Sequence, residues 1–372
     1  MQECRNANTG IKFWYLLRHS IFAFTVSLIV ASTPSLTAHA QPCDNLVFEG
    51  GGIRGIAYCG ALEVLQQSGK LNEVKRVAGT SVGAIQATVV ALNYTPQEMA
   101  MLIADLNLKH FNDGGFIFIG GTHRLRRNYG WYKGNKLRTW IGDLLETKTG
   151  NAELTFGELH ALAQTKGFKD LYVTGTDLTQ QRMEVFSYEN YPDMKIKDAV
   201  RISVSIPLYY GAVFMDSLQN ITYRPQKNTK YRIFIDGGII GNFPIHIFDQ
   251  ARYMTNADST AHIKYNPNTL GIRLDSDDQI RYDMDGKGLA PFRITGMKSY
   301  MSAFYTVILE NLNRQNLTSE DWKRTISIST AYIGPKVRKL PAHDKDALIA
   351  SGRKGTEAFL KAHREAPTEP AK

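Results

Sequence analysis

Residues 74–92 have the sequence VKRVAGTSVGAIQATVVAL, and this stretch decides the fold class. Val74–Ala78 predicts a short buried strand, and Val82–Leu92 predicts a helix. The turn between them, Gly79-Thr-Ser81-Val-Gly83, matches the G-x-S-x-G pattern. A serine in such a strand-to-helix turn exposes its hydroxyl at the end of a sheet. The stretch therefore predicts an α/β fold with Ser81 as the candidate nucleophile.

The same arrangement occurs just upstream. Asn45–Phe48 predicts a buried strand, and a helix is expected from about Arg54 to Gln67. The glycine-rich loop between them leaves backbone N–H groups pointing at whatever occupies the helix N-terminus. The loop is suited to be an oxyanion hole, and its candidate residues are Gly50, Gly51, Gly52, Arg54 and Gly55. A nucleotide-phosphate loop is the alternative, because these glycines also match G-x-G-x-x-G loosely.

Further short apolar runs and helical patterns follow along the chain. Strands are expected at Leu171–Thr174, Arg232–Ile235 and Thr269–Leu274, and helices at Leu137–Leu145, Phe156–Gln164 and Ser351–Ala362. The repeated strand, turn and helix predict a mostly parallel sheet covered by helices. No internal repeat or linker divides the 372 residues, so we expect one domain at 43–364 and a disordered tail at 365–372.

An aspartate ends the strand expected at 232–235. Asp236 is followed by Gly237 and Gly238. A carboxylate at the carboxyl end of a strand lies where open α/β sheets build their active sites, and the glycines leave it unobstructed. Asp236 is therefore a candidate base. An aspartate that only satisfies a turn is the alternative for an isolated D-G-G.

The order of the three motifs points to one family. G-G-G-x-R-G at 50–55, G-x-S-x-G at 79–83 and D-G-G at 236–238 together resemble the patatin-like phospholipases, as do 203–207, 242–244 and 269–275. The resemblance implies a three-layer fold whose mostly parallel sheet has helices on both faces. It also implies a Ser-Asp dyad of Ser81 and Asp236, flanked by Gly79, Gly83, Gly237 and Gly238. The dyad would cleave phospholipid or lysophospholipid esters through an acyl-enzyme, with no metal and no cofactor.

Two alternatives to this function are kept. A serine triad would recruit a histidine after Asp236, and His246, His262 and His343 are the candidates in the sequence. The dyad is preferred because none of the three lies in a recognisable pattern. A non-catalytic lipid- or phosphate-binding protein could use the same scaffold, since fold alone does not prove function.

The N-terminal residues predict export. Lys12, Arg18 and His19 precede the apolar run 21–31, and Ala38-His-Ala40 offers the small residues that a signal peptidase recognises. We therefore expect a signal peptide at 1–40 and a periplasmic or secreted protein. An uncleaved membrane anchor is the alternative, although the run is shorter than the ~20 residues that span a bilayer.

The net charge of +9 favours anionic surfaces. Basic residues are mixed with tryptophan and tyrosine between positions 124 and 133, as is typical of a membrane interface. The candidate membrane-docking residues are Arg124, Arg126, Arg127, Trp131 and Lys133. We expect a peripheral contact with a lipid membrane and no nucleic acid, although such segments also bind single strands. An activating partner is left open.

Overall fold

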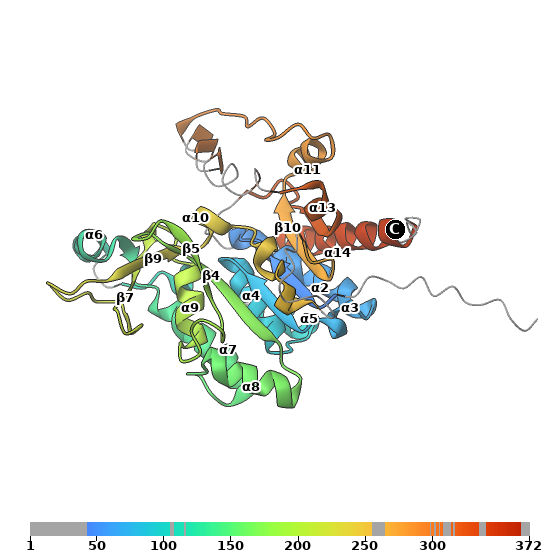
Figure 1. Ribbon diagram of the computed structural model, residues 1–372. Coiled ribbons are helices and arrows are strands. Elements are labelled where there is room, and N and C mark those ends of the chain that lie inside the picture. Colours follow the sequence, from blue (N-terminus) through green and yellow to red (C-terminus); the bar gives the residue numbers. More distant parts are fainter. Residues whose placement is uncertain are drawn as a thin grey trace, which may run out of the picture. The chain divides into compact units, whose positions relative to one another are not determined.

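A computed structural model describes residues 43–365 with short gaps (Figure 1). The gaps are residues 105–107, 115–116, 255–264, 298, 301–302, 305, 308–313, 315–316 and 335–339. The predicted signal peptide and the residues after Glu365 lie outside the described residues. What is described belongs to one compact unit. No helix in this part of the chain is long and apolar enough to cross a membrane.

A central sheet and a small two-stranded sheet contain all the strands of the described residues. The strands are β1 (Asn45–Phe48), β2 (Arg76–Gly79), β3 (Gly130–Tyr132), β4 (Asp170–Asp177), β5 (Arg182–Phe186), β6 (Leu208–Tyr210), β7 (Val213–Met215), β8 (Ile221–Thr222), β9 (Arg232–Asp236), β10 (Thr269–Asp275) and β11 (Thr325–Ser329). In the central sheet the order is β11-β10-β1-β2-β4-β9-β7-β8, and β5 also pairs with β4. β3 and β6 form the small sheet.

The central sheet is parallel from β11 to β4 and antiparallel beyond it. β1 and β4 are buried along their whole length, as expected for parallel strands covered on both faces. The mostly parallel sheet expected from the sequence is confirmed, and the strand before Asp236 belongs to its antiparallel part, because β9 runs antiparallel to β4. Asp236 still arrives beside the end of β2, since β9 pairs only with residues 175–177 of β4.

Helices cover the sheet. They are α2 (Ala57–Gln67), α3 (Lys70–Glu73), α4 (Val82–Ala91), α5 (Pro96–Ala104), α6 (Ile117–Asn128), α7 (Asn135–Thr149), α8 (Phe156–Lys166), α9 (Ile196–Ser203), α10 (Gly238–Gly241), α11 (Asp277–Met284), α13 (Ser319–Lys323) and α14 (Ala342–Glu365). Short 3-10 helices lie at Gly52–Ile56, Leu108–Phe111, Ile245–Phe248 and Ala251–Tyr253.

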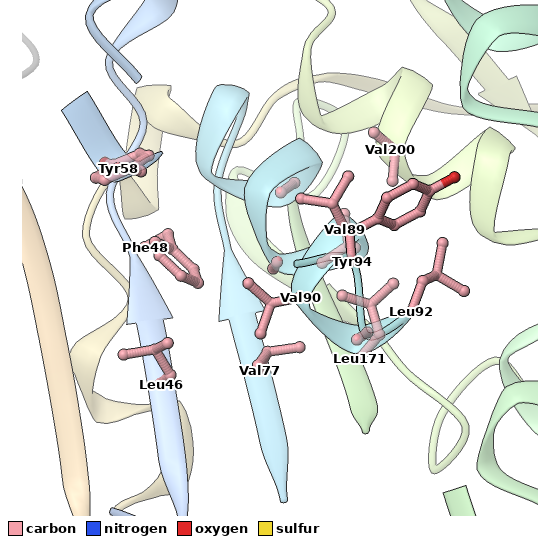
Figure 2. Close-up of a cluster of buried hydrophobic side chains, with 14 of the residues drawn as sticks. Leu46, Phe48, Tyr58, Val77, Val89, Val90, Leu92, Tyr94, Leu171 and Val200 are labelled. Atoms are coloured by element: carbon pink, nitrogen blue, oxygen red, sulfur yellow. The ribbon is translucent and has the colours of Figure 1, made fainter. Parts of the chain in front are cut away.

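Alternate residues of the strands feed two separate apolar clusters. Leu46 and Phe48 of β1 belong to the larger cluster, and Figure 2 shows them with Val77 of β2 on the side where Val90 of α4 lies. Val47 points to the opposite face, where it packs in a smaller cluster with Phe243, Ile245, Ile247, Phe248 and Tyr253. The three-layer architecture predicted from the sequence is thus confirmed, with the second face covered by short helical turns.

Local sequence signals set several helix ends. α8 begins with a capping box, in which Thr155 accepts a hydrogen bond from the Glu158 amide and the Glu158 side chain returns one. α7 lies between Gly134 and Gly150, both of which have left-handed backbone conformations. α14 begins nine residues earlier than expected, at Ala342 rather than at Ser351.

Candidate functional site

Ser81 occupies the sharp turn between β2 and α4. Its backbone has φ 54° and ψ −123°, an unfavourable conformation for a residue other than glycine. Gly83 makes this turn feasible, because a Cβ on it would lie 2.5 Å from the carbonyl oxygens of both Phe48 and Glu49. The serine therefore lies at the N-terminal end of α4, where the helix dipole stabilises negative charge.

Asp236 is the hydrogen-bond partner of the Ser81 hydroxyl. Ser81 Oγ lies 2.9 Å from Asp236 Oδ2, and Asp236 Oδ1 accepts a hydrogen bond of 2.8 Å from the Gly238 amide. The register explains this meeting, because Gly79 pairs with Val173 and Asp236 pairs with the residue two positions further along β4. The two side chains therefore reach the same level along the sheet with no histidine between them.

The Asp236 carboxyl is buried, and burial raises its pKa to about 6. Removal from water disfavours the charged form, while the hydrogen bonds from Gly238 and Ser81 partly offset this effect by stabilising the carboxylate. A carboxyl group with a pKa near neutrality is a better proton acceptor than an ordinary aspartate and is still ionised at pH 7.

The end of α9 supports both residues of the pair. Ser203 Oγ accepts a hydrogen bond of 2.8 Å from the Ser81 amide, and the Ser205 carbonyl accepts one of 2.9 Å from the Asp236 amide. Both serines are fully buried. This segment was noted in the sequence only for its family resemblance, without a role.

The glycine-rich loop lies directly against the nucleophile. A Cβ on Gly50 would lie 3.3 Å from Ser81 Cβ and 2.3 Å from Asn242 Oδ1, so a larger residue would have to displace the Asn242 side chain. The prediction of Gly50 as an amide donor to an oxyanion needs correction, because its N–H donates to the Asn242 carbonyl at 3.0 Å. Gly50 instead gives the close approach between loop and serine.

Three neighbouring amides remain available to a ligand. Among the described residues, the N–H groups of Gly51, Gly52 and Val82 have no hydrogen-bond acceptor. Val82 was not singled out in the sequence, although the residue after the nucleophile commonly supplies an oxyanion-hole amide. Gly51 and Gly52 follow Gly50 in the loop beside Ser81, and Val82 directly follows Ser81 at the start of α4.

Arg54 and Gly55 stabilise this loop rather than extend it. Arg54 Nε donates to the Gly51 carbonyl at 3.0 Å, and Gly55 packs so closely on Val82 that a Cβ would come within 2.7 Å of it. The Arg54 side chain therefore fixes the direction of the Gly51 peptide.

Glu49 anchors the beginning of the same loop. It is buried, it pairs with Arg273 Nη2 at 3.1 Å, and it accepts a hydrogen bond of 2.9 Å from the Leu274 amide. A buried carboxylate without such partners would cost several kcal/mol. Neither Glu49 nor Arg273 carried a sequence pattern that predicts this pairing, since buried ion pairs form between residues far apart in the chain.

An apolar cavity of about 140 Å³ opens beside Ser81. One wall is a face of α4, formed by Val82, Ile85, Gln86 and Val89, and this wall extends about 12 Å from the serine at the usual rise of a helix. The other lining residues are almost all apolar and include Met99, Leu102, Phe111, Leu137, Trp140, Val204, Ile206, Tyr209 and Tyr210. The cavity suits a hydrocarbon chain attached to a group at Ser81.

Gln86 is the exception in this lining. It is 5% exposed, and its Nε2 donates to the sulfur of Met99 at 3.2 Å, which is a weak acceptor. Gln86 lies five residues after Ser81, about 7.5 Å along the helix axis. A polar amide thus meets whatever enters the cavity beyond its first few ångströms.

The triad candidates lie elsewhere or outside the described residues. His246 is half-exposed, its Nε2 lies 3.0 Å from Asp321 Oδ2, and it lines a second cavity of about 360 Å³ that does not include Ser81. His343 lies at the start of α14 beside Asp344. His262 is outside the described residues.

His246, Asp249 and Asp321 are the only group among the described residues with metal-ligand proximity. Both carboxylates already bind Arg324, whose Nη2 lies 2.7 Å from Asp249 and 2.6 Å from Asp321. The guanidinium supplies the positive charge that a cation would bring, so this group is an ion-pair cluster.

The predicted membrane-docking residues lie on α6 and in β3 or just after it. Arg126, Arg127 and Lys133 are exposed. Arg124 and Trp131 are half-buried, because Arg124 Nε donates to the Trp131 carbonyl at 2.8 Å and the Trp131 ring packs on Gly121. Arg126, Arg127 and Lys133 therefore present their charges to the surroundings, whereas Arg124 and Trp131 contact each other.

The four glycines expected to flank the Ser81 and Asp236 pair lie in the two turns that hold it. Gly79 ends β2, Gly83 lies in the first turn of α4, and Gly237 and Gly238 follow Asp236 at the start of α10. The Gly237 amide donates to the Ser203 carbonyl at 3.4 Å, while the Gly238 amide binds Asp236 itself. All four flanking glycines expected from the sequence thus surround the Ser81 and Asp236 pair.

Known proteins share this combination of motifs and fold. The profile of the family described as patatin-like phospholipase matches residues 46–249, more than half of the chain. The uncharacterized protein YqhO of Bacillus subtilis is 35% identical over 216 residues, which are 55% of this chain and 67% of YqhO. The probable lipid hydrolase 463L of Invertebrate iridescent virus 6 is 28% identical over 203 residues, covering 54% of this chain and 62% of that protein.

Among solved structures, VipD from Legionella pneumophila has a similar fold, with a TM-score of 0.52 at 16% identity. The match covers 86% of this chain and 67% of VipD. The chain thus spans about two thirds of the length of these relatives. From the extent of the family match and the identity to YqhO, the chain belongs to the patatin-like phospholipase family.

Proposed function

We propose that this protein is an exported lipid acyl hydrolase in which Ser81 is the nucleophile and Asp236 its base. Family membership and the similarity to a protein named a probable lipid hydrolase support a lipid hydrolase in general. The observation that carries the finer proposal is the hydrogen bond of 2.9 Å between Ser81 Oγ and Asp236 Oδ2 at the mouth of an apolar cavity.

In the proposed first step, Asp236 removes the proton of the Ser81 hydroxyl while Oγ attacks the ester carbonyl. The amides of Gly51, Gly52 and Val82 stabilise the negative charge on the carbonyl oxygen. Collapse of this intermediate returns the proton to the leaving alcohol and leaves the acyl group on Ser81.

In the second step, Asp236 takes a proton from water, and the resulting hydroxide attacks the acyl-enzyme. The same amides stabilise the second oxyanion, and the proton returns to Ser81 when the fatty acid leaves. Every proton transfer uses side chains of this chain. Two residues therefore do the work of a triad because Asp236, with its raised pKa, is basic enough to act without a histidine.

The substrate is proposed to be a phospholipid or lysophospholipid, with its acyl chain in the cavity beside α4. Apolar walls favour hydrocarbon at about 25 cal/mol per Å² of surface removed from water. An apolar cavity of about 150 Å³ holds a group the size of benzene, so the enclosed part of the chain is short, on the order of six carbons.

Export and peripheral membrane contact complete the proposal. The basic start, apolar run and Ala38-His-Ala40 of the N-terminal segment support export. N-terminal sequencing of the protein recovered outside the cytoplasm tests this directly. A first residue at Gln41 supports the proposal, and an intact Met1 contradicts cleavage.

The experiment for catalysis is fatty acid release from phospholipid and lysophospholipid vesicles in the presence of a chelator. The parent is compared with Ser81→Ala and Asp236→Asn, and circular dichroism checks that all three are folded. The proposal expects release by the parent alone. Equal release by a folded Ser81→Ala protein would contradict it.

A further inference from the structure

The chain segment after β10 exposes several large apolar side chains. Six of them, Met284, Phe292, Ile294, Met297, Tyr300 and Phe304, have exposed fractions between 49% and 83%. Single exposed apolar residues are ordinary on a soluble protein, whereas a group along one segment marks a binding surface. We call these six residues the apolar segment.

The topology places the start of the apolar segment at the carboxyl ends of the parallel strands, where Ser81 also lies. β10 is parallel to β1, and β1 leads at its carboxyl end into the loop of Gly50–Gly52. Leu274 near the end of β10 contacts that loop, since a Cβ on Gly51 would lie 2.5 Å from Leu274 Cδ1. Figure 1 shows α11 beyond the tip of β10, and the apolar segment continues from there.

Ion pairs attach the start of the segment to the sheet. Arg314 binds both Asp275 at the end of β10 and Asp283 in α11. Asp275 is buried, and the neighbouring guanidinium groups of Arg273 and Arg314 hold its pKa below the usual range. Asp275 and Asp283 therefore stabilise the base of the segment through Arg314.

The chemistry of the segment fits a lipid surface. From residue 286 to residue 309 the sequence has no acidic residue, and it includes the exposed Lys287 and Arg293. Tyrosine and phenylalanine at the headgroup level, with basic residues among them, are typical of proteins that lie on anionic membranes. Tyr332, 85% exposed after the parallel strand β11, leaves the sheet at the same edge.

We propose that the apolar segment is the surface by which this protein docks on an anionic lipid bilayer, with the Ser81 site toward the membrane. The inference rests on the proposed function, since a membrane lipid substrate requires such an approach. It also places the contact on residues other than the basic α6 residues expected from the sequence.

The test measures binding of the full chain to sedimented vesicles of phosphatidylcholine and phosphatidylglycerol. The triple variant Phe292→Ser, Ile294→Ser, Met297→Ser should bind at least about tenfold more weakly than the parent. Leu218→Ser is the matched control, because Leu218 is 80% exposed in the turn between β7 and β8, at the opposite end of the sheet from β11. Its binding should equal that of the parent.

A dye that reports apolar surroundings gives a second readout. Phe292→Cys and Leu218→Cys are labelled in a Cys4→Ser background. The native Cys43 and Cys59 are buried, and burial raises the pKa of each thiol to about 12, so they react slowly. Vesicles should shift the emission of the dye at position 292 and leave the dye at position 218 unchanged.

Hydrolysis of a soluble short-chain ester separates docking from catalysis. The triple variant should keep the parent rate on this ester and lose hydrolysis of vesicles. A parent that binds vesicles through the segment and hydrolyses no ester would refute the catalytic proposal alone. Unchanged vesicle binding by the triple variant overturns the docking proposal. If the oligomeric state of this variant changes while its vesicle binding does not, the segment is a contact between copies of the chain instead. A loss only in the Arg126→Gln, Arg127→Gln variant would assign docking to α6 instead.

Discussion

Ser203 Oγ accepts the backbone N–H of Ser81 at 2.8 Å, from the end of a helix 122 residues further along the chain. Ser81 has positive φ, and its amide is satisfied by this hydrogen bond to the fully buried Ser203. Two residues on, the Ser205 carbonyl accepts the amide of Asp236. One short segment thus sets the position of both the candidate nucleophile and its candidate base.

Ser203→Ala should therefore lower kcat more than it changes KM. Loss of the acceptor leaves the partly buried N–H of Ser81 unsatisfied, which should lower the free energy of unfolding by about 1–3 kcal/mol. Misplacement of the Ser81 hydroxyl should lower kcat by roughly 10- to 100-fold on a soluble ester. Ser203→Thr keeps the hydroxyl and should restore most of the rate. Equal kcat values for the alanine variant and the parent would show that the contact has no positioning role.

The pKa of Asp236 predicts the pH dependence of activity. Because burial raises this pKa to about 6, kcat/KM on an uncharged ester should rise with pH, reach half its maximum near pH 6 and level off roughly one unit above it. Steady-state rates from pH 4 to pH 9 test this. A plateau that already begins near the ordinary pKa of aspartate, about 3.9, would contradict the role of burial.

The same shift predicts how stability changes with pH. An unfolded aspartate has a pKa of about 3.9, so between about pH 4 and pH 6 the folded state binds more protons than the unfolded state. As the pH rises through this window, the free energy of unfolding therefore decreases, and the contribution of Asp236 to this decrease is about 3 kcal/mol in total.

Asp236→Asn should consequently be inactive and yet more stable than the parent at pH 8. Its advantage should shrink towards zero at pH 4, where the parent carboxyl is protonated as well. Urea unfolding at both pH values measures the difference. A variant that is less stable than the parent at pH 8 would be inconsistent with a charged, desolvated carboxylate.

Gln86→Leu should change the preference for acyl chain length. An apolar chain that passes Gln86 leaves the amide with only the sulfur of Met99 as its partner. Leucine removes this cost, so kcat/KM should increase by about three- to tenfold for esters long enough to reach position 86. Acetyl esters should be unaffected. A uniform change across the whole series of chain lengths would place Gln86 outside the acyl path.

Gly50→Ala should disable the site without unfolding the protein. A Cβ there lies 2.3 Å from Asn242 Oδ1 and 3.3 Å from Ser81 Cβ, so the Asn242 side chain, which binds Glu49 and the Gly50 carbonyl, must shift and disturb the loop. A loss of oxyanion-hole geometry lowers kcat on the order of 10²-fold. Gly334→Ala is the control, since a Cβ at that position meets nothing within 4 Å. Similar rates for the two variants would argue against a role for the loop.

The sequence predicted the parallel half of the fold well, because those strands are short apolar runs next to glycine turns. Asn45–Phe48 agrees at both ends, and the expected strands before Ser81 and Asp236 lie within two residues of β2 and β9. It did not predict that β9 is antiparallel. The direction of a strand depends on its partner, and the strands β7 and β8 on the far side of β9 are only three and two residues long, too short to be recognised in the sequence.

The candidate site divides in the same way. Ser81 and Asp236 could be named from local motifs, since each motif includes the glycines that its turn requires. The supporting contacts could not, because Glu49 with Arg273 and Ser81 with Ser203 join residues more than 100 positions apart. Such pairs can be identified only from the folded structure.

The most direct test of the central claim is covalent trapping of the nucleophile. The Ser81 oxygen should attack the phosphorus of a fluorophosphonate with an alkyl chain and displace fluoride while Asp236 takes the hydroxyl proton, and peptide mass spectrometry should find the phosphonyl group on Ser81 alone. Asp236→Asn should label at a strongly reduced rate, and Ser81→Ala should not label. Labelling of another residue, or equal rates for the parent and Asp236→Asn, would contradict the proposed pair.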